Sequence, residues 1–242
     1  MKDAYIVTGY RTAVGKAPRG TLRFTRPDEM AAKVIQRLME DFPNLDTDRI
    51  DDVMVGCAMP EAEQGLNMAR LVSLMGLDTD KVSGVTINRY CASGSESIAT
   101  AIAKIRTGMA NCIIAGGAES MSYIPMGGYK PIPDPKVSEK NADYYWGMGL
   151  TAEAVANEFN ISREDQDKFA LDSQLKAAKA QENGRLAEEI MEVVIPQRKG
   201  EPIIFSKDEF VRPHSTFESL QKLRPAFKKG GTVTAGNASG LN

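Results

Sequence analysis

Short apolar runs alternate with helical patterns through the first half of the chain, and this alternation limits the possible folds more than any other feature. The apolar runs are Ala4–Val7, Val53–Cys57, Val85–Ile87 and Cys112–Ala115. Apolar residues recur at helical spacing between them, over about 28–41, 67–75 and 92–106. Strands that alternate with helices are typical of a mostly parallel sheet covered by helices, so the sequence predicts an α/β fold.

Local signals mark the ends of some helices. Asp28 can cap the first of them. Gly108 follows the third, where glycine commonly ends a helix. Ser162 and Asp165 open a longer helix as a capping box in which Asp replaces Glu.

The pattern changes after Glu119. Residues 121–150 are rich in Gly, Pro, Met and aromatic residues and show no clean alternation. A long irregular stretch of this kind inside a domain is usually functional. Beyond it we expect helices at 151–159, 162–182 and 217–223, and a short antiparallel pair at 193–195 and 203–205. Residues 232–242 resemble a strand that enters a turn of small residues, so we expect the complete protein to continue past them.

Composition narrows the classes of function. Thirty Lys and Arg nearly balance thirty-two Asp and Glu. The net charge therefore gives no overall electrostatic attraction to nucleic acid or to an acidic membrane surface. No stretch approaches the ~18 apolar residues that a membrane span needs. Three cysteines are too few and too far apart for a disulfide framework or a zinc site, and an odd count favours a reducing compartment. We therefore expect a soluble cytoplasmic protein without a metal site.

Cys91 is the sharpest chemical feature of the sequence. It lies within Asn88–Gly94, between the strand that ends near Ile87 and the helix that follows. Unpaired N–H groups and the dipole at a helix amino terminus favour a thiolate. The residues that follow, Ala92 to Gly94, are small enough for a bulky acyl chain to approach the sulfur. Cys91 is therefore a candidate nucleophile, with a merely buried thiol as the alternative.

Two other cysteines and one histidine have plainer interpretations. Cys57 and Cys112 lie in apolar strands, where cysteine behaves as a small hydrophobe. His214 is the only histidine and lies in a polar segment, so we interpret it as a surface residue. A cysteine nucleophile needs a base, and we expect the base of Cys91 to lie outside this chain.

Two further segments suggest ligands but have competing explanations. Gly147–Ala152 matches the G-x-G-x-x-A pattern, yet no convincing strand precedes it, so we do not expect a dinucleotide site there. The basic residues between Arg212 and Lys229 could meet the phosphates of a nucleotide-type thioester carrier. On spacing alone, a solvated charged face is the favoured explanation.

Taken together, the motifs of this chain resemble the thiolase family. The matching segments are Arg11–Gly15, Asn88–Gly94, Gly116–Ser122, Met148–Glu153, Lys222–Phe227 and Gly231–Asn242. They occur in the family's order and cover essentially the whole chain. The resemblance implies a thiolase-like layered α/β/α/β/α fold. Residues 1–118 would supply its N-terminal half, and residues 119–242 a loop domain that binds coenzyme A and returns to the core.

The resemblance also implies a chemistry. By similarity, Cys91 carries the acyl group in transfers between acyl-CoA and acetyl-CoA, with coenzyme A as substrate and no prosthetic group. The positions where the family contacts coenzyme A are Met148, Arg212, Ser219, Phe227, Ala235 and Ser239. The family's activating histidine and second cysteine belong to a C-terminal half whose motifs do not occur here, so we expect this chain alone to be inactive. The family further implies a homodimer or homotetramer.

The sequence favours one branch of the family. Asn88–Gly94 and the loop 126–146 resemble degradative 3-ketoacyl-CoA thiolases of fatty-acid β-oxidation. A biosynthetic acetoacetyl-CoA thiolase, the alternative, usually has a histidine where this chain has Gly147. Rivals from other classes are a non-catalytic acyl-CoA-binding protein, a ketoacyl synthase and a subunit that completes a partner's site. The loop insertion and the Ser239 segment fit thiolases better than synthases.

Overall fold

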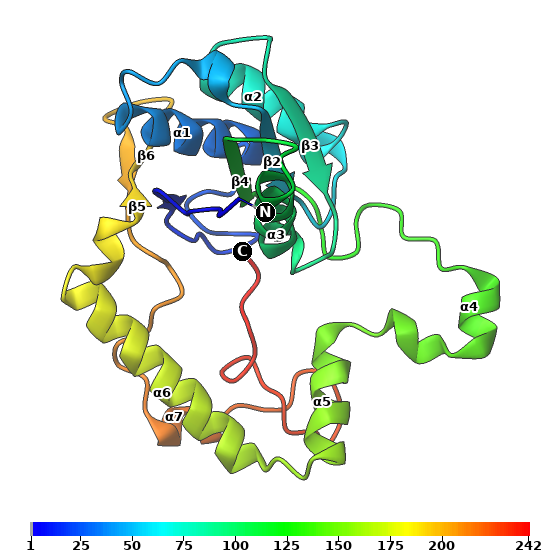
Figure 1. Cartoon of the computed structure of the whole chain (residues 1–242). Helices are drawn as coiled ribbons and strands as arrows, with labels where there is room; N and C mark the ends of the chain where they lie inside the picture. Colours follow the sequence, from blue (N-terminus) through cyan, green and yellow to red (C-terminus); the bar gives the residue numbers. More distant parts are fainter. Residues whose placement is uncertain (1) are drawn as a thin grey trace. The chain divides into compact units, whose positions relative to one another are not determined.

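The computed structural model describes residues 2–242, which form two compact units (Figure 1). One unit comprises the chain up to Tyr129 together with Ala187–Glu209 and Asn242. The other comprises Lys130–Leu186 and Phe210–Leu241. We call the first the sheet unit and the second the helical unit.

Three parallel strands form the centre of the sheet unit. They are β2 (Asp52–Gly56), β3 (Ser83–Ile87) and β4 (Ile113–Gly117). Their order is β3-β2-β4, and Gly56 at the end of β2 lies opposite Ile87 on one side and Gly117 on the other. The segments that follow the three strands therefore begin at the same edge of the sheet.

Helices cover both faces of this sheet. Side chains alternate across a strand, and Val53 and Val55 pack in one buried cluster with α1 (Pro27–Glu40) and α2 (Met68–Leu77). The opposite face meets α3 (Ser93–Arg106), whose Lys104 Nζ lies 2.7 Å from Asp52 Oδ2. The sheet unit is therefore layered α/β/α, as the alternation of apolar runs and helical patterns predicted.

Helix boundaries follow local chemistry, with one correction. Gly108 adopts a φ of +79° directly after Thr107, the C-cap of α3, as expected of glycine at a helix end. Asp28 does not cap α1, because Arg26 occupies the cap and Pro27 begins the helix, a position that suits the fixed φ of proline. Asp28 lies buried in the first turn instead, 2.9 Å from the Arg26 guanidinium.

The amino-terminal segment is not the strand that its sequence predicted. Ala4–Val7 belongs to no sheet, and the chain first pairs at β1 (Arg11–Thr12), parallel to β5 (Ile190–Met191). A strand needs a partner for its backbone groups. Among the described residues β4 pairs only with β2, and an apolar groove of about 750 Å³ lies between β4 and residues 4–12.

The expected antiparallel pair is confirmed as β6 (Val193–Ile195) and β7 (Ile203–Phe205). Its buried cluster contains Ala13, Leu22, Val193 and Phe205. Arg11 holds this part of the unit together, since its guanidinium donates two hydrogen bonds to the Asp208 carboxylate at 2.8 and 3.0 Å. The segment that begins at Arg11 thus has a structural role.

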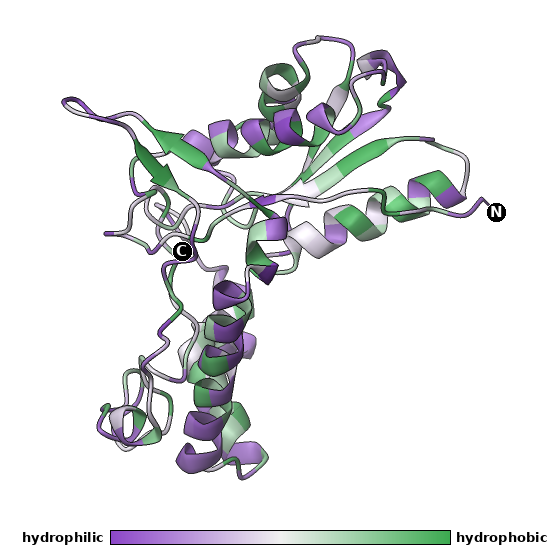
Figure 2. Ribbon diagram, turned by 90° about the vertical axis from the view of Figure 1, so that its left-hand side faces the viewer, coloured by the Kyte–Doolittle hydropathy of each residue, from purple (hydrophilic) through white to green (hydrophobic). Residues whose placement is uncertain are grey.

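The helical unit contains α4 (Pro135–Lys140), α5 (Met148–Glu158), α6 (Arg163–Glu182) and α7 (Phe217–Gln221). Ser162 caps α6 as expected, because its Oγ accepts a hydrogen bond from the Asp165 N–H at 3.0 Å. The other half of the predicted capping box is wrong, because the Asp165 carboxylate accepts from the Ser162 hydroxyl at 2.6 Å and not from the Ser162 N–H. Hydrophilic residues cover most of α6 (Figure 2), and Asp167 is its one fully buried residue. The described residues also form short 3-10 helices, in both units, at Thr47–Arg49, Ala62–Gln64, Ala142–Tyr145 and Arg185–Glu188.

The strand expected within 232–242 is wrong. Thr234 forms an isolated bridge with Pro225, and the rest of this segment is turn and coil. Side chains replace the strand partner here: the Thr234 N–H donates to Asn237 Oδ1 at 2.7 Å, and the Gly236 N–H donates to Thr234 Oγ1 at 3.1 Å. Such local side-chain bonds satisfy the backbone without a sheet.

Glycines at the ends of β2 and β4 let α3 approach the backbone of the sheet. A Cβ at Gly56 would lie 2.2 Å from the carbonyl carbon of Ser93. A Cβ at Gly117 would lie 3.2 Å from the Cα of Gly94. Because the obstructing atoms belong to the backbone, they cannot rotate away. The first turn of α3 therefore rests directly on the sheet edge.

We expect Gly56→Ala to lower the free energy of unfolding of the sheet unit by about 1–3 kcal/mol, the usual effect of forcing a methyl group into a packed interior. Gly116→Ala is the matched control, because a Cβ there meets nothing within 4 Å. Urea denaturation followed by far-UV circular dichroism compares the two variants. Equal stabilities would contradict the close contact at Gly56.

Candidate active site

Cys91 lies in the tight turn that joins β3 to α3. β3 ends at Ile87 and α3 begins at Ser93, two residues after the cysteine. Cys91 is exposed to solvent. The first amides of a helix have no partners within the helix, and with the dipole they favour a nearby anion. The structure thus places an accessible thiol beside the amino terminus of α3.

Hydrogen bonds fix the turn on both sides of the cysteine. The Asn88 side-chain oxygen accepts from the Tyr90 N–H at 2.9 Å. The Ser93 hydroxyl accepts from the Arg89 N–H at 2.8 Å and donates to the Tyr90 carbonyl at 2.6 Å. Tyr90 has a φ of +48°, a left-handed conformation that costs a non-glycine residue about 1–2 kcal/mol. The turn is therefore held in a form that Tyr90 alone would not favour.

The other two thiols are kept protonated. Burial, followed by the nearby Glu119 carboxylate, raises the pKa of Cys57 to about 12. Burial likewise raises the pKa of Cys112, which is half-buried. Both cysteines match the expectation that they pack as small hydrophobes. Cys91 is the exposed one of the three.

The helical unit holds the six residues predicted to contact coenzyme A, and all six are exposed. Met148 begins α5 and Ser219 lies in α7. The other four, Arg212, Phe227, Ala235 and Ser239, lie in the segments before and after α7. Ser219 also has a structural part, because its hydroxyl and that of Thr216 form a capping box at the start of α7.

Glycine contacts show which of these residues lie near one another. A Cβ on Gly149 would lie 2.2 Å from the Phe227 ring, so Phe227 packs on the first turn of α5 beside Met148. A Cβ on Gly236 would lie 2.7 Å from the Leu220 side chain, which brings the turn after Ala235 to α7. The structure therefore places Phe227 against Gly149, the residue after Met148, and the Ala235 segment against α7.

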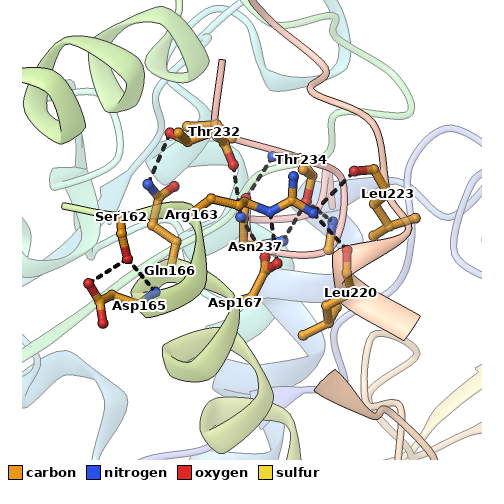
Figure 3. Close-up of polar contacts among 12 residues, drawn as sticks. Ser162, Arg163, Asp165, Gln166, Asp167, Leu220, Leu223, Thr232, Thr234 and Asn237 are labelled. Carbon is orange, nitrogen blue, oxygen red and sulfur yellow. Dashed lines mark hydrogen bonds and ion pairs between the residues drawn. The ribbon is translucent and has the colours of Figure 1, made fainter. Parts of the chain in front are cut away.

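A buried ion pair joins α6 to α7 and to the turn that carries Ala235 (Figure 3). The Arg163 Nε lies 2.7 Å from Asp167 Oδ2, and Asp167 is fully buried. Arg163 Nη2 also donates to the carbonyls of Leu220 and Leu223, at 2.7 and 3.1 Å. The Asn237 amide donates to Asp167 Oδ1 at 2.9 Å. The ion pair thus holds both segments: Arg163 binds the carbonyls of the α7 segment, and Asp167 binds Asn237.

Glu153 of α5 does the same for the residues just before this turn. Its carboxylate accepts from the backbone N–H groups of Thr232 at 2.9 Å and Val233 at 2.8 Å. Burial acts to raise the pKa of Glu153, but the hydrogen bonds from Thr232 and Val233 outweigh it and lower the pKa below its ordinary value. The ionised form of Glu153 is therefore the one that stabilises this segment.

Other candidate features do not form sites. Gly147 is the N-cap of α5 and follows the 3-10 helix Ala142–Tyr145, so no strand precedes the G-x-G-x-x-A pattern. His214 is exposed in the helical unit. Across residues 2–242 no three His, Cys, Asp or Glu side chains are placed to hold a metal ion, and no helix is long and apolar enough to cross a membrane.

Comparison with known families decides the identity of the domain. The sequence model described as the thiolase N-terminal domain matches residues 4–242. The chain belongs to the thiolase family. Its segments around Cys91 and after Lys222 lie within the matched range.

Relatives of this thiolase domain are longer than the chain. It is 47% identical over 249 residues to a 3-ketoacyl-CoA thiolase of Bacillus subtilis (strain 168), a match that covers 99% of this chain and 63% of that protein. It is 41% identical over 254 residues to a probable acetyl-CoA acyltransferase of Staphylococcus aureus (strain COL), covering 100% of this chain and 64% of that protein. The chain thus spans less than two thirds of the length of these relatives.

A solved structure confirms the fold class. The crystal structure of the Bacillus anthracis acetyl-CoA acetyltransferase matches 96% of this chain and 61% of that protein, with a TM-score of 0.82 and 34% identity. The thiolase-like layered α/β fold predicted from the sequence is therefore confirmed.

The site residues of this thiolase domain that were predicted from the sequence are exposed, and the residues that hold their segments in place were not predicted. Arg163 binds the segment bearing Ser219, and Asp167 and Glu153 bind the segment bearing Ala235. One signal was present: Arg163 and Asp167 are four residues apart, which is the spacing of a helical ion pair. The bonds of Asp167 and Glu153 to segments about 70 and 80 residues away left no local signal.

Brief treatment of the native chain with iodoacetamide at neutral pH should modify Cys91 and spare Cys57. Thiolate is the reactive form, and with its pKa raised to about 12 the buried Cys57 stays protonated. Peptide mapping by mass spectrometry identifies the modified residue. Treatment in urea is the control, since unfolding should make all three cysteines reactive. Modification of Cys57 in the native chain would contradict this assignment.

Glu153→Gln should destabilise the helical unit by about 1–2 kcal/mol at neutral pH, because it removes charge-assisted hydrogen bonds to Thr232 and Val233. A carboxyl whose pKa is lowered on folding contributes stability above its ordinary value of 4.5, and this contribution is lost as the pH falls through the folded-state pKa. The difference between wild type and variant should therefore shrink below about pH 4.5.

Urea unfolding followed by Trp146 fluorescence measures this effect, because Trp146 is the single tryptophan and lies in the helical unit. Glu158→Gln is the matched control, an exposed glutamate on the same helix. A difference between wild type and Glu153→Gln that persisted unchanged into acid would rule out the ionised carboxylate as its source.

Proposed function

We propose that this chain is the nucleophile-bearing part of a degradative 3-ketoacyl-CoA thiolase that acts in fatty-acid β-oxidation. The Cys91 thiolate attacks the β-ketone carbon of the substrate, and the bond between the α and β carbons breaks. The α carbon takes up a proton and leaves as acetyl-CoA. The thiol of a second coenzyme A then attacks the acyl-cysteine and releases a shortened acyl-CoA, while the proton of that thiol returns to Cys91.

One observation carries this proposal: Cys91 is the exposed cysteine, in a hydrogen-bonded turn at the amino terminus of α3. A covalent acyl-enzyme needs a thiolate that a substrate can reach, and the two other thiols are at least half-buried. The name of the Bacillus subtilis relative, a 3-ketoacyl-CoA thiolase, supports the same chemistry.

Coenzyme A binding is proposed for residues 119–242, with residues 1–118 as the half that carries Cys91. Met148 and Phe227 would offer adjacent apolar contacts, and exposed Arg212 a charge for a phosphate. Ser219, Ala235 and Ser239 would line the rest of the thioester carrier. No prosthetic group takes part, because the thiol–thioester exchange uses only Cys91 and coenzyme A. We further propose a cytoplasmic homodimer or homotetramer.

The alternative is a biosynthetic acetoacetyl-CoA thiolase. Gly147 caps α5 at the position where that branch usually has a histidine, which favours the degradative direction. The name of the Bacillus anthracis structure, an acetyl-CoA acetyltransferase, favours the alternative. A preference for acylation by a longer 3-ketoacyl-CoA over acetoacetyl-CoA would support the degradative proposal, and the reverse preference the biosynthetic one.

Proton transfer sets the limit on turnover. Among the described residues of the sheet unit no hydrogen bond links the Cys91 thiol to a carboxylate, and the only histidine, His214, belongs to the helical unit. Since general-base catalysis contributes about 100- to 10,000-fold, we expect slow acylation of Cys91 by the isolated chain and no sustained turnover.

Incubation with acetoacetyl-CoA should add one acetyl group to the chain, detected by intact-mass spectrometry. The adduct should disappear in Cys91→Ala and persist in Cys112→Ala, the matched control at a half-buried thiol. An adduct that survives in Cys91→Ala would overturn the assignment of the nucleophile. Tight binding of acyl-CoA without any adduct would favour a non-catalytic acyl-CoA-binding protein.

A further inference from the structure

We propose that Glu119 and Gln64 form a hydrogen-bonded clamp that positions the turn bearing Cys91, and that Ala58 and Asn88 transmit this effect. The proposal deepens the proposed function and rests on Cys91 as its nucleophile. It gives a role to the Gly116–Ser122 segment, which the chemistry of acyl transfer leaves without one.

The clamp joins the segments that follow β2 and β4. Glu119 Oε2 accepts a hydrogen bond from the Ala58 N–H at 2.6 Å, and Glu119 Oε1 accepts from the Gln64 amide. Gln64 is fully buried, and its own oxygen accepts from the Ser120 N–H at 2.6 Å. Its amide also donates to the Met59 carbonyl at 2.8 Å. The nitrogen and the oxygen of the Gln64 side chain are therefore both hydrogen-bonded, and together they link the segment after β2 to the segment after β4.

Ala58 connects the Glu119 carboxylate to the turn that bears Cys91. Its N–H is held by Glu119, and its carbonyl accepts from the Asn88 amide at 3.0 Å. The Asn88 oxygen in turn accepts from the Tyr90 N–H at 2.9 Å. Tyr90 is the residue next to Cys91. Three consecutive hydrogen bonds thus connect the Glu119 carboxylate to the backbone beside the candidate nucleophile.

The conformation of Tyr90 explains why the turn needs this support. A left-handed φ of +48° is unfavourable for tyrosine and persists only where the surroundings enforce it. Release of Asn88 would let Tyr90 relax and would carry Cys91 away from the amino terminus of α3. The clamp therefore acts on the direction of the thiol relative to the helix amino terminus.

Glu119 is a positioning residue and not a base. Its two oxygens accept from Ala58 and Gln64, and the nearest thiol that it meets is Cys57, whose Sγ lies 3.8 Å away. A fully buried amide such as Gln64 and a half-buried carboxylate such as Glu119 cost free energy unless their polar atoms are hydrogen-bonded. A role in aligning the backbone segments after β2 and β4 explains why the Gln64 amide and the Glu119 carboxylate are both placed there.

The test is the rate at which iodoacetamide alkylates Cys91 in the full 242-residue chain, measured by intact mass. Asn88→Ala and Glu119→Gln should each slow alkylation about two- to fivefold, the range that a helix amino terminus contributes to stabilising an anion. Glu61→Gln is the matched control: this carboxylate also accepts a backbone N–H, from Tyr129 at 2.8 Å, but makes no bond to Ala58. It should react at the wild-type rate.

The double variant separates positioning from general stability. If the clamp acts through Asn88, Glu119→Gln should slow alkylation in the wild-type background but not in the Asn88→Ala background. If the two substitutions instead damage the structure independently, the double variant should be slowed by the product of the two single-variant factors. Multiplying effects, or a wild-type rate in Glu119→Gln, would overturn the proposal.

Asn88→Asp keeps the proposal testable if Glu119→Gln fails to fold, because Asn88 is exposed. Aspartate retains the acceptor for Tyr90 but cannot donate to the Ala58 carbonyl. We expect slowed alkylation, and a wild-type rate would contradict transmission through Ala58. Alkylation needs no coenzyme A, so failure of acyl transfer would count against the proposed function while leaving these rates interpretable.

Discussion

The backbone contact between the strand ends and the first turn of α3 is the constraint on which the sheet unit depends. Parallel pairing sets Gly56 and Gly117 side by side, and the absence of a Cβ at Gly56 lets Ser93 approach. The contact fixes where α3 begins, and Cys91 occupies the turn immediately before it. A helix that stood off by the width of a side chain would carry the thiol away from the sheet edge where Asn88 meets Ala58.

Buried carboxylates, more than apolar side chains, order the segments of the helical unit. Its buried apolar side chains are few, namely Ala156, Leu220 and Val233, and α6 is largely hydrophilic. Apolar burial therefore contributes little to the order of its long segments, and carboxylates take that part. Glu153 accepts from the backbone N–H groups of Thr232 and Val233, and Asp167 accepts from the Asn237 amide and from its helical neighbour Arg163. Buried carboxylates are stabilising only when fully paired, so these contacts also specify one arrangement of the turn at 232–237.

Prediction from sequence succeeded where the signal was local. The three central strands and the longer helices follow from apolar spacing, and Gly108 and Ser162 mark helix ends through their own local preferences. The short helix α4 was not predicted, because it lies in the stretch 121–150 that shows no clean alternation. Prediction failed at Ala4–Val7 and at 232–242, since an apolar β-branched run becomes a strand only when a partner pairs with it. The capping of α1 failed for a smaller reason: Pro27 and Asp28 compete for the same turn, and proline at the first helical position decides the boundary.

The sequence alone determined the layered α/β class, the family and the presence of a cysteine between a strand and a helix. These depend on periodicity and on ordered motifs, which survive without coordinates. Tertiary structure alone decided that Cys91 is exposed while Cys57 is buried beside Glu119, and which distant donors hold each buried carboxylate. Burial and hydrogen bonding are properties of residues brought together from remote parts of the chain, and no local pattern records which of them will meet.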